Sequence, residues 1–295
     1  MTAREEGFLL LGSSLGNPER KYLTTAQLRT LALRVTAAEH STQDRDLTAA
    51  DLTALGYSPE MAAHFIRLLD DTALLQHYLH KASRNGCVPI TRVTEGYPVR
   101  LRQRLGNDSP GVLWAKGDLS ILKKPAIALV GSRDITPDNA DFAAQVGRKA
   151  ARQGYVLISG NARGADRTAQ QACLAAGGQV ISIIADELLK QKRHPNVLYL
   201  SEEGYDSAFS SLRALSRNRV IHALGEKTLV AQCSFATGGT WSGTVQNLKN
   251  RWTPVFCFHD GSEANRQLEQ LGATLIDLPA LEDLASLQDS HLSLF

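Results

Sequence analysis

The chain has 295 residues, enough for one large domain or two ordinary ones, so the size of the core is no obstacle to folding. Hydrophobic residues make up 43% and charged residues 21%, as is usual for a soluble globular protein. The formal net charge of +2 is too small to indicate nucleic-acid binding by overall charge, so any basic surface must be local.

The first 85 residues predict a small all-helical domain. Apolar residues recur there at helical spacing, and no stretch alternates convincingly as a strand does. Thr48 and Asp51 have the spacing of a helix cap, and Pro59 stands where the first turn of a helix tolerates proline. We therefore expect four or so short helices in a bundle.

Two features predict a cytoplasmic protein. The apolar patch from Phe8 to Leu11 is too short for a signal-peptide core or a membrane span. The four cysteines have neither C-x-x-C spacing nor histidines at zinc-ligand spacing, which is typical of free thiols in a reducing compartment. We expect no membrane contact, no metal site and no cofactor. These cysteines are Cys87, Cys173, Cys233 and Cys257.

From about residue 86 the pattern changes to strands, and from Pro125 onward strands alternate regularly with helices. Such alternation predicts an α/β fold with a mostly parallel sheet and helices on both faces. We place the domains at 1–85 (helical), 86–280 (sheet) and 281–295 (a short tail). The expected strands are 88–90, 112–115, 126–130, 155–158, 179–184, 227–232, 254–258 and 273–276. The expected helices are 138–153, 165–176, 210–224, 242–251 and 264–271.

Two of the strand–turn–helix units carry an arginine in the turn. The first turn is Gly131-Ser132-Arg133, and the second runs from Ser159 to Gly164 and contains Arg163. In a parallel sheet such turns meet at the carboxyl ends of the strands, where helix N-termini and free amides suit a phosphate. We therefore predict a phosphate-bearing ligand. The turns lack the G-x-G-x-x-G and G-K-[ST] patterns, which disfavours a dinucleotide enzyme and an ordinary ATPase.

Asp166, at the start of the following helix, is expected to cap it or to pair with an arginine rather than to catalyse.

Two further clusters favour an anion. Ser216-Arg217-Asn218-Arg219 lies within a predicted helix, where arginine forks suit phosphate oxygens and Asn218 can bond a base edge or a backbone group. The alternative for this cluster is a solvated helix face with salt bridges.

The run Thr237-Gly238-Gly239-Thr240 opens a later helix, and Trp241 offers either a stacking face or a core side chain. We expect all four clusters to converge on one edge of the sheet.

In order and spacing, these residues resemble the DNA-processing protein A family (DprA or Smf), within a wider Rossmann-like group that includes the LOG enzymes. The similarity runs from Gly96-Tyr97-Pro98 to about Asp277, and the helical segment resembles that family's sterile-alpha-motif-like (SAM-like) domain. The resemblance implies an extended Rossmann-like fold. It also implies single-stranded DNA binding by a homodimer and delivery of that DNA to the recombinase RecA, in recombination or natural transformation.

For individual residues, the resemblance implies that Arg133 contacts a DNA phosphate and that Arg163 lines the same pocket. Arg217 and Arg219 match the family's basic helix. The predicted ligand-binding residues are Gly131, Ser132, Arg133, Ser159, Gly160, Asn161, Arg163, Gly164, Asp166, Arg217, Asn218, Arg219, Thr237, Gly238, Gly239 and Thr240.

The chain also departs from the family pattern. Gln232 replaces an acid, the stretch 237–244 is altered, and we expect no winged helix after the sheet domain. Residues 238–244 also resemble the phosphate-binding turn of LOG phosphoribohydrolases, but Asn247 stands where those enzymes need glutamate. We therefore predict a DNA-binding protein and no enzyme. The alternative is a nucleotide-binding sensor or hydrolase that uses the same pocket, for example in phage defence.

Overall fold

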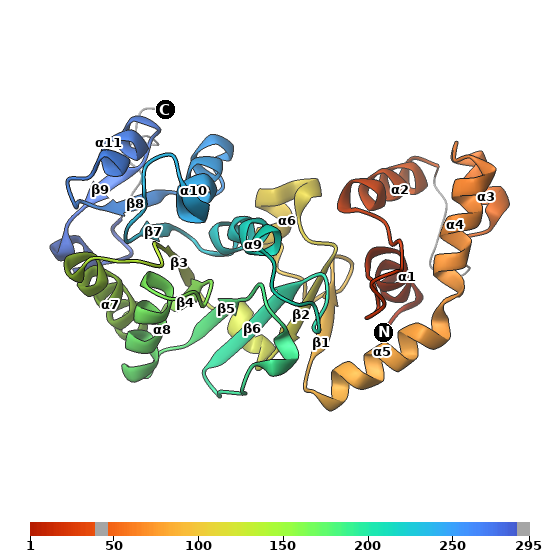
Figure 1. Ribbon diagram of the computed structural model, residues 1–295, viewed down its shortest axis with the longest axis horizontal. Helices are drawn as coiled ribbons and strands as arrows, with labels where there is room; N and C mark the ends of the chain where they lie inside the picture. Colours follow the sequence, from red (N-terminus) through yellow and green to blue (C-terminus); the bar gives the residue numbers. More distant parts are fainter. Residues whose placement is uncertain (39–46, 288–295) are drawn as a thin grey trace.

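The computed structural model describes residues 1–38 and 47–287, and it places a group of N-terminal helices beside a sheet covered by further helices (Figure 1). Thr48 and Asp51 form a capping box and Pro59 occupies the first turn of its helix, as predicted. The apolar patch at Phe8 belongs to a helix that the sequence analysis did not identify. The α-helices before the first strand are α1 (Ala3–Gly12), α2 (Thr25–Ala37), α3 (Ala49–Ala54), α4 (Pro59–Asp70) and α5 (Thr72–Arg84).

No helix in the described part of the chain is long and apolar enough to cross a membrane.

The sheet confirms the α/β class. Its order is β1-β2-β6-β5-β4-β3-β7-β8-β9, and only the β1–β2 and β2–β6 pairs are antiparallel. The strands are β1 (Val88–Thr91), β2 (Val112–Lys116), β3 (Ala126–Val130), β4 (Val156–Ser159), β5 (Val180–Ile183), β6 (Val197–Glu202), β7 (Thr228–Val230), β8 (Val255–Phe258) and β9 (Thr274–Ile276).

Strand β6 was missed by the sequence analysis. Only a short 3₁₀ turn, Leu188–Lys190, lies between β5 and β6, so the strand–helix alternation on which the prediction relied is interrupted there. Between β1 and β2, where no helix was expected, the structure contains α6 (Val99–Leu105).

Helices cover both faces of the sheet. Ile127 and Leu129 of β3 pack in one buried cluster with α7 and α8, whereas Ala128 and Val130 pack in the other cluster with α6, α9 and α11. This alternation is the period-2 pattern of a strand that is buried on both sides. The helices after α6 are α7 (Pro137–Arg152), α8 (Ala165–Ala175), α9 (Ser211–Leu224), α10 (Gly238–Asn250) and α11 (Glu263–Gln270).

The two domains share a buried aromatic cluster. Tyr78 of α5 lies 5.4 Å from Trp114 of β2 and 4.4 Å from Tyr205, measured between ring centroids. The Tyr78 hydroxyl also donates a 2.6 Å hydrogen bond to Asp206. This contact fixes the helical domain against the β1–β2 side of the sheet, away from β3, β4 and β7.

The end of the chain and the cysteines complete the core. Leu281 and Leu284 are fully buried in the cluster that contains α7, so the described part of the segment assigned to a tail packs on the sheet domain. All four cysteines are free and buried.

Candidate functional site

The candidate site lies where the connections of the sheet change direction. After β3 the chain proceeds through β4, β5 and β6 on one side, and it returns to the other side of β3 as β7. The carboxyl ends of β4, β3 and β7 are therefore neighbours, and ligands of open parallel sheets bind in the crevice at such a point. The predicted turns after these strands meet there.

Gly131 begins the first turn at a position with no room for a side chain. A Cβ atom on Gly131 would collide with the Cβ of Ala165 in α8. The turn is also fixed from the other side, because the Ser132 amide donates to the Gln232 carbonyl (2.9 Å) and the Thr240 hydroxyl donates to the Gly131 carbonyl (3.0 Å). The turn after β3 thus depends on residues after β4 and β7.

The second turn is organised by Asp166. Its carboxylate accepts hydrogen bonds from the backbone amides of Gly160 (3.1 Å) and Ala162 (3.2 Å). Asn161 between them adopts a left-handed φ of 58°. Burial raises the pKa of Asp166, while Arg217 and the two amides act in the opposite direction. Asp166 therefore holds the turn before its helix. Of the two expected roles, α8 has no side-chain cap, and only the electrostatic interaction with Arg217 has support.

Arg217 is a buried cation beneath that turn. Only 8% of the residue is exposed, and its guanidinium donates to the backbone carbonyls of Gly160 and Ile183. Its Nε atom has no hydrogen-bond partner among the described residues. Arg217 brings positive charge close to the turn, and both hydrogen bonds that hold it come from Nη1.

Arg133 differs from Arg217 in being exposed and unpaired. Within residues 1–38 and 47–287 its guanidinium makes no hydrogen bond and no ion pair. Arg163 is exposed too, but it pairs with Asp134 at 2.6 Å. Because both partners of that pair are in water, it is weak and can open for a ligand.

Arg219 is directed elsewhere. It forms a two-point ion pair with Glu202 of β6, at 3.0 and 2.7 Å, and it lines neither of the hollows described below. Positions 217 and 219 are about 200° apart around a helix, so the two arginines of α9 face different sides. The predicted basic helix therefore contributes one arginine to the site, not two.

The fourth cluster forms the first turn of α10. This helix begins at Gly238, four residues earlier than expected, with Thr237 as an N-cap that makes no side-chain cap bond. The first amides of a helix have no partner within it. Asn218 and Thr240 hold the turn through hydrogen bonds to the carbonyls of Gly239 (2.9 Å) and Gly131 (3.0 Å).

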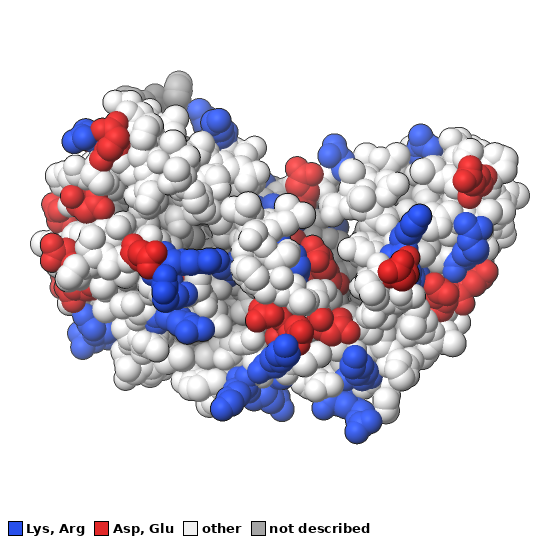
Figure 2. All heavy atoms as spheres, in the orientation of Figure 1, with Lys and Arg blue, Asp and Glu red and all other residues white. Residues whose placement is uncertain are grey.

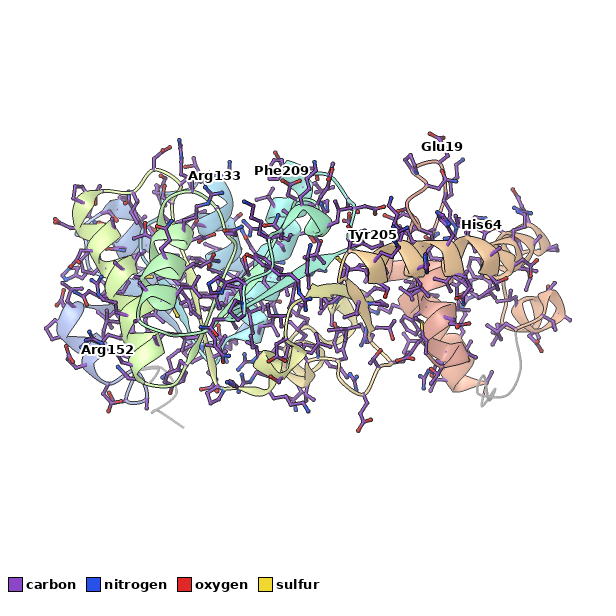
Figure 3. The ribbon with its side chains drawn as sticks, turned by 90° about the horizontal axis from the view of Figure 1, so that it is seen from below. Glu19, His64, Arg133, Arg152, Tyr205 and Phe209 are labelled. Atoms are coloured by element: carbon purple, nitrogen blue, oxygen red, sulfur yellow. The ribbon has the colours of Figure 1, made fainter. Side chains whose placement is uncertain are left out.

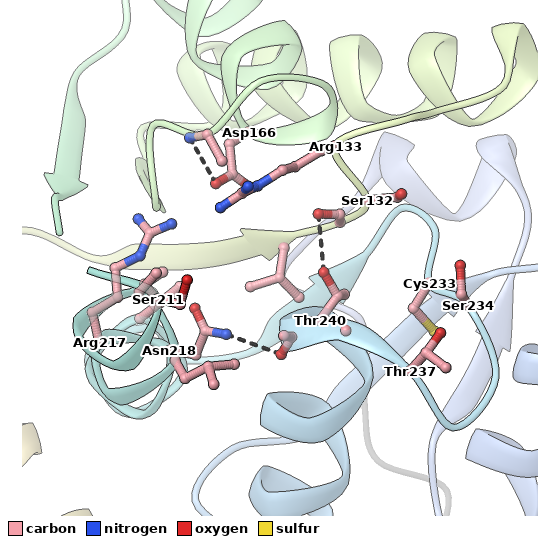
Figure 4. A pocket seen from close by; sticks show the side chains of 18 of the residues that line it. Ser132, Arg133, Asp166, Ser211, Arg217, Asn218, Cys233, Ser234, Thr237 and Thr240 are labelled. Atoms are coloured by element: carbon pink, nitrogen blue, oxygen red, sulfur yellow. Dashed lines mark hydrogen bonds between the residues drawn. The ribbon is translucent and has the colours of Figure 1, made fainter. Parts of the chain in front are cut away.

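Two adjacent hollows result, and we call them the first and the second hollow. The first has a volume of about 410 Å³, and Arg133, Arg217 and Thr240 reach it from three different elements (Figure 4). The second, about 420 Å³, is lined by Gly160 and Arg163 as well as by Arg133 and Arg217. Figure 2 shows basic side chains gathered near α8 and β4 on this part of the surface.

Most of the predicted residues line these hollows, and three do not. Ser159 is fully buried and accepts a hydrogen bond from Gln170 (2.6 Å), Gly164 packs against the first turn, and Arg219 pairs with Glu202. Predicted residues of the first hollow are Gly131, Ser132, Arg133, Asp166, Arg217, Asn218, Thr237, Gly238, Gly239 and Thr240. Those of the second are Arg133, Gly160, Asn161, Arg163 and Arg217.

The sequence analysis missed lining residues as well. Arg167, exposed in the first turn of α8, lines the second hollow, and it could have been found because it directly follows the motif that ends at Asp166. Phe209 lines the same hollow from the loop before α9, and no local signal marked it.

The floor of the first hollow contains a neutral histidine. Burial lowers the pKa of His222 to about 3, and its Nδ1 atom lies 3.1 Å from the Thr228 hydroxyl and 3.2 Å from Asn247 Nδ2. Asn247 is fully buried and does not line the hollow. Within the described residues no three His, Cys, Asp or Glu side chains are grouped to hold a metal ion.

A comparison with protein families gives a match to the model described as DNA recombination-mediator protein A, over residues 89–285. The DNA processing protein DprA of Streptococcus pneumoniae is 31% identical over 184 residues, 57% of this chain and 64% of that protein. The DprA of Bacillus subtilis is 31% identical over 162 residues, 51% of this chain and 53% of that protein. The chain thus spans between about half and two thirds of the length of these relatives.

Solved structures show the same fold. The X-ray structure of DprA from Streptococcus pneumoniae superposes with a TM-score of 0.72 at 24% identity, over 94% of this chain and 95% of that one. A structure of DprA from Helicobacter pylori, described by its single-stranded DNA binding mode, gives 0.54 at 24% identity, over 64% and 90%.

Proposed function

The chain belongs to the DNA recombination-mediator protein A family, and on that premise we propose that it binds single-stranded DNA at the carboxyl ends of β3, β4 and β7. The phosphates would occupy the two hollows, which share Arg133 and Arg217. The single observation that carries this proposal is the guanidinium of Arg133, which is exposed, lines both hollows and makes no hydrogen bond or ion pair within the described chain.

The surroundings of Arg133 support a polyanion. Arg163 and Arg167 line the second hollow, and the uncapped first turn of α10 borders the first one. Amides of a helix N-terminus and arginine forks both bind phosphate oxygens. Because two hollows lie side by side, a strand with several phosphates fits the arrangement better than a single phosphate does.

The proposal is one of binding without catalysis. The carboxylate of Asp166 already accepts two backbone amides, and Asn247 stands buried where the related hydrolases have glutamate. Asn247 has no titratable group, and the two amide bonds to Oδ2 of Asp166 give that carboxylate a role in holding its own loop.

Partners form the second part of the proposal. The family description as a recombination mediator supports delivery of the bound strand to RecA, and the resemblance supports a homodimer acting in the cytoplasm. Light scattering would measure the oligomeric state. RecA-filament assembly on a strand coated with single-strand-binding protein, with and without this protein, would measure delivery.

The test of DNA binding is a salt titration with a fluorescent single strand, a duplex and mononucleotides. We expect tight binding of the single strand at low salt, with affinity falling steeply as salt rises because counterions are released. Arg133→Ala should weaken binding about tenfold or more and reduce the salt slope by about one.

Arg152 provides the matched control. It is exposed and lies at the opposite edge of the sheet domain from Arg133 (Figure 3). Arg152→Ala should leave binding unchanged. Absence of tight binding at low salt, or equal effects of the two substitutions, would contradict the proposal.

One observation favours a second candidate, a small nucleotide in the first hollow. The buried atom His222 Nε2, on its floor, has no hydrogen-bond partner among the described residues. A base edge reaching the floor would satisfy such an atom. Native mass spectrometry of the purified protein distinguishes the two candidate functions. A nucleotide bound to the protein would support the second candidate, and protein without a bound nucleotide would count against it.

A further inference from the structure

Two exposed phenylalanine rings belong to loops that contribute lining residues to the hollows of Arg133. Phe209 is 52% exposed and lines the second hollow, and Phe235 is 47% exposed and lies between Ser234 and Thr237, which line the first hollow. No other phenylalanine in residues 1–38 and 47–287 is exposed. Phenylalanine is among the residues most often buried, so two exposed rings at one site require an explanation.

Phe235 is held in place by Trp241. The two ring centroids are 5.1 Å apart with the rings at 84°, an edge-to-face pair. Trp241 is partly buried and packs against the core cluster that contains β3 and α9. Ala236, next to Phe235, has a left-handed φ of 55°, a conformation that persists only where the surroundings fix it. The ring is therefore pre-positioned at the rim of the first hollow.

The N-terminal turns of α9 carry further exposed apolar side chains. Leu212 is 77% exposed and Leu215 is 50% exposed, and Leu215 also lines the first hollow. Figure 3 shows Phe209 at the same edge of the molecule as Arg133. Phe209 and Leu215 thus bring apolar side chains to the two hollows that Arg133 also lines.

We propose that Phe209 and Phe235 stack on unpaired bases of the strand whose phosphates contact Arg133, and that this stacking makes the protein selective for single strands. The inference rests on the proposed DNA-binding function. Every base has a π-face, so phenylalanine, which has no hydrogen-bonding group, would bind bases with little sequence preference. In a duplex the bases are paired and stacked on one another, and their faces are closed to the rings.

The experiment compares two single strands of equal length, one normal and one lacking its bases at the central positions. Wild-type protein should bind the normal strand more tightly than the abasic one, and both affinities should fall with salt. Phe209→Ala and Phe235→Ala should each weaken binding of the normal strand about 5- to 150-fold and leave the abasic strand and the salt slope unaffected.

Conservative variants separate stacking from general packing. Phe235→Tyr keeps an aromatic ring and should retain its affinity for the normal strand. Phe235→Leu keeps only an apolar side chain and should lose as much of this affinity as Phe235→Ala does. Leu119→Ala, which removes another exposed apolar side chain (40%) outside both hollows, should have no effect. Thermal unfolding of each variant shows whether it is folded.

The outcomes distinguish this inference from the proposed function. Equal wild-type affinity for the normal and abasic strands, or alanine variants that bind normally, would overturn the stacking inference and leave phosphate binding intact. Failure of wild-type protein to bind either strand would overturn both. If light scattering showed that the alanine variants lose a dimer while retaining selectivity, the rings would belong to self-association and not to bases.

Discussion

Gly164 lies directly against the main chain of Arg133: a Cβ atom at Gly164 would collide with the Arg133 carbonyl oxygen and with that of Ser132. The Ala165 amide also donates to the Ser132 carbonyl at 3.1 Å. The turns after β3 and β4 are therefore docked backbone to backbone. The position of the unpaired arginine depends on a glycine in another turn.

Replacement of Gly164 by alanine should lower both stability and DNA affinity. Gly164 has a φ of 83°, which L-residues rarely adopt, and the added methyl group would separate the turns. Left-handed strain and overpacking together should cost about 2 to 5 kcal/mol of the free energy of unfolding, measured by urea denaturation.

Gly154 is a matched control for this substitution. It has a similar φ of 76°, but no atom lies within 4 Å of its would-be Cβ. Gly154→Ala should therefore cost only the strain of about 1 to 2 kcal/mol and should bind DNA normally. Equal stability losses with unchanged binding in both variants would show that the docking of the turns is dispensable.

Asp134→Ala should strengthen DNA binding. The carboxylate lies 2.6 Å from Arg163, with the Asp134 side chain 87% exposed, so its removal frees a cation beside the second hollow at little cost in stability. At low salt we expect the affinity for DNA, measured by fluorescence anisotropy, to rise about two- to fivefold. At high salt this gain should disappear. Asp141→Ala, which breaks the exposed pair with Arg148, should change nothing. Weaker binding by Asp134→Ala would contradict the prediction.

Arg219→Ala should reduce stability and leave DNA affinity unchanged. The ion pair with Glu202 has two hydrogen bonds and is more than four-fifths buried, so its loss should cost about 1 to 3 kcal/mol of the free energy of unfolding. A double-mutant cycle with Glu202→Ala measures the coupling between the two side chains. A variant of normal stability but reduced affinity would instead place Arg219 on the DNA.

His222 should make folding sensitive to mild acid. Burial lowers its pKa from 6.5 to about 3, so below pH 6.5 the unfolded chain binds a proton that the folded chain does not. This contribution to stability is fully present above pH 6.5 and is lost as the pH falls toward 3, by at most about 1.4 kcal/mol per pH unit. The stability difference between wild type and His222→Gln should therefore narrow over that range.

If the free energies of unfolding of wild type and His222→Gln differed by the same amount from pH 7 to pH 4, His222 would be excluded as the source of the acid sensitivity.

The sequence by itself determined the local features of this protein. The apolar run 126–130 followed by Gly131-Ser132-Arg133 predicts a buried strand and a turn, and the structure contains both. The capping box at Thr48 and the first-turn position of Pro59 were predicted from short-range spacing in the same way. Such features depend on backbone sterics and hydrogen bonds between residues a few positions apart, and those are visible in the order of residues.

Only the tertiary structure decided which of these residues act together. Arg217 and Arg219 are nearly equivalent in sequence, yet one is buried beneath the second turn and the other pairs with β6, a strand the sequence analysis missed. Phe209 joins Arg133 at one hollow although 76 positions separate them in the chain. The order of strands in the sheet and the packing of helices on it set these neighbours, because contacts between distant segments depend on the burial of whole faces and not on any local pattern.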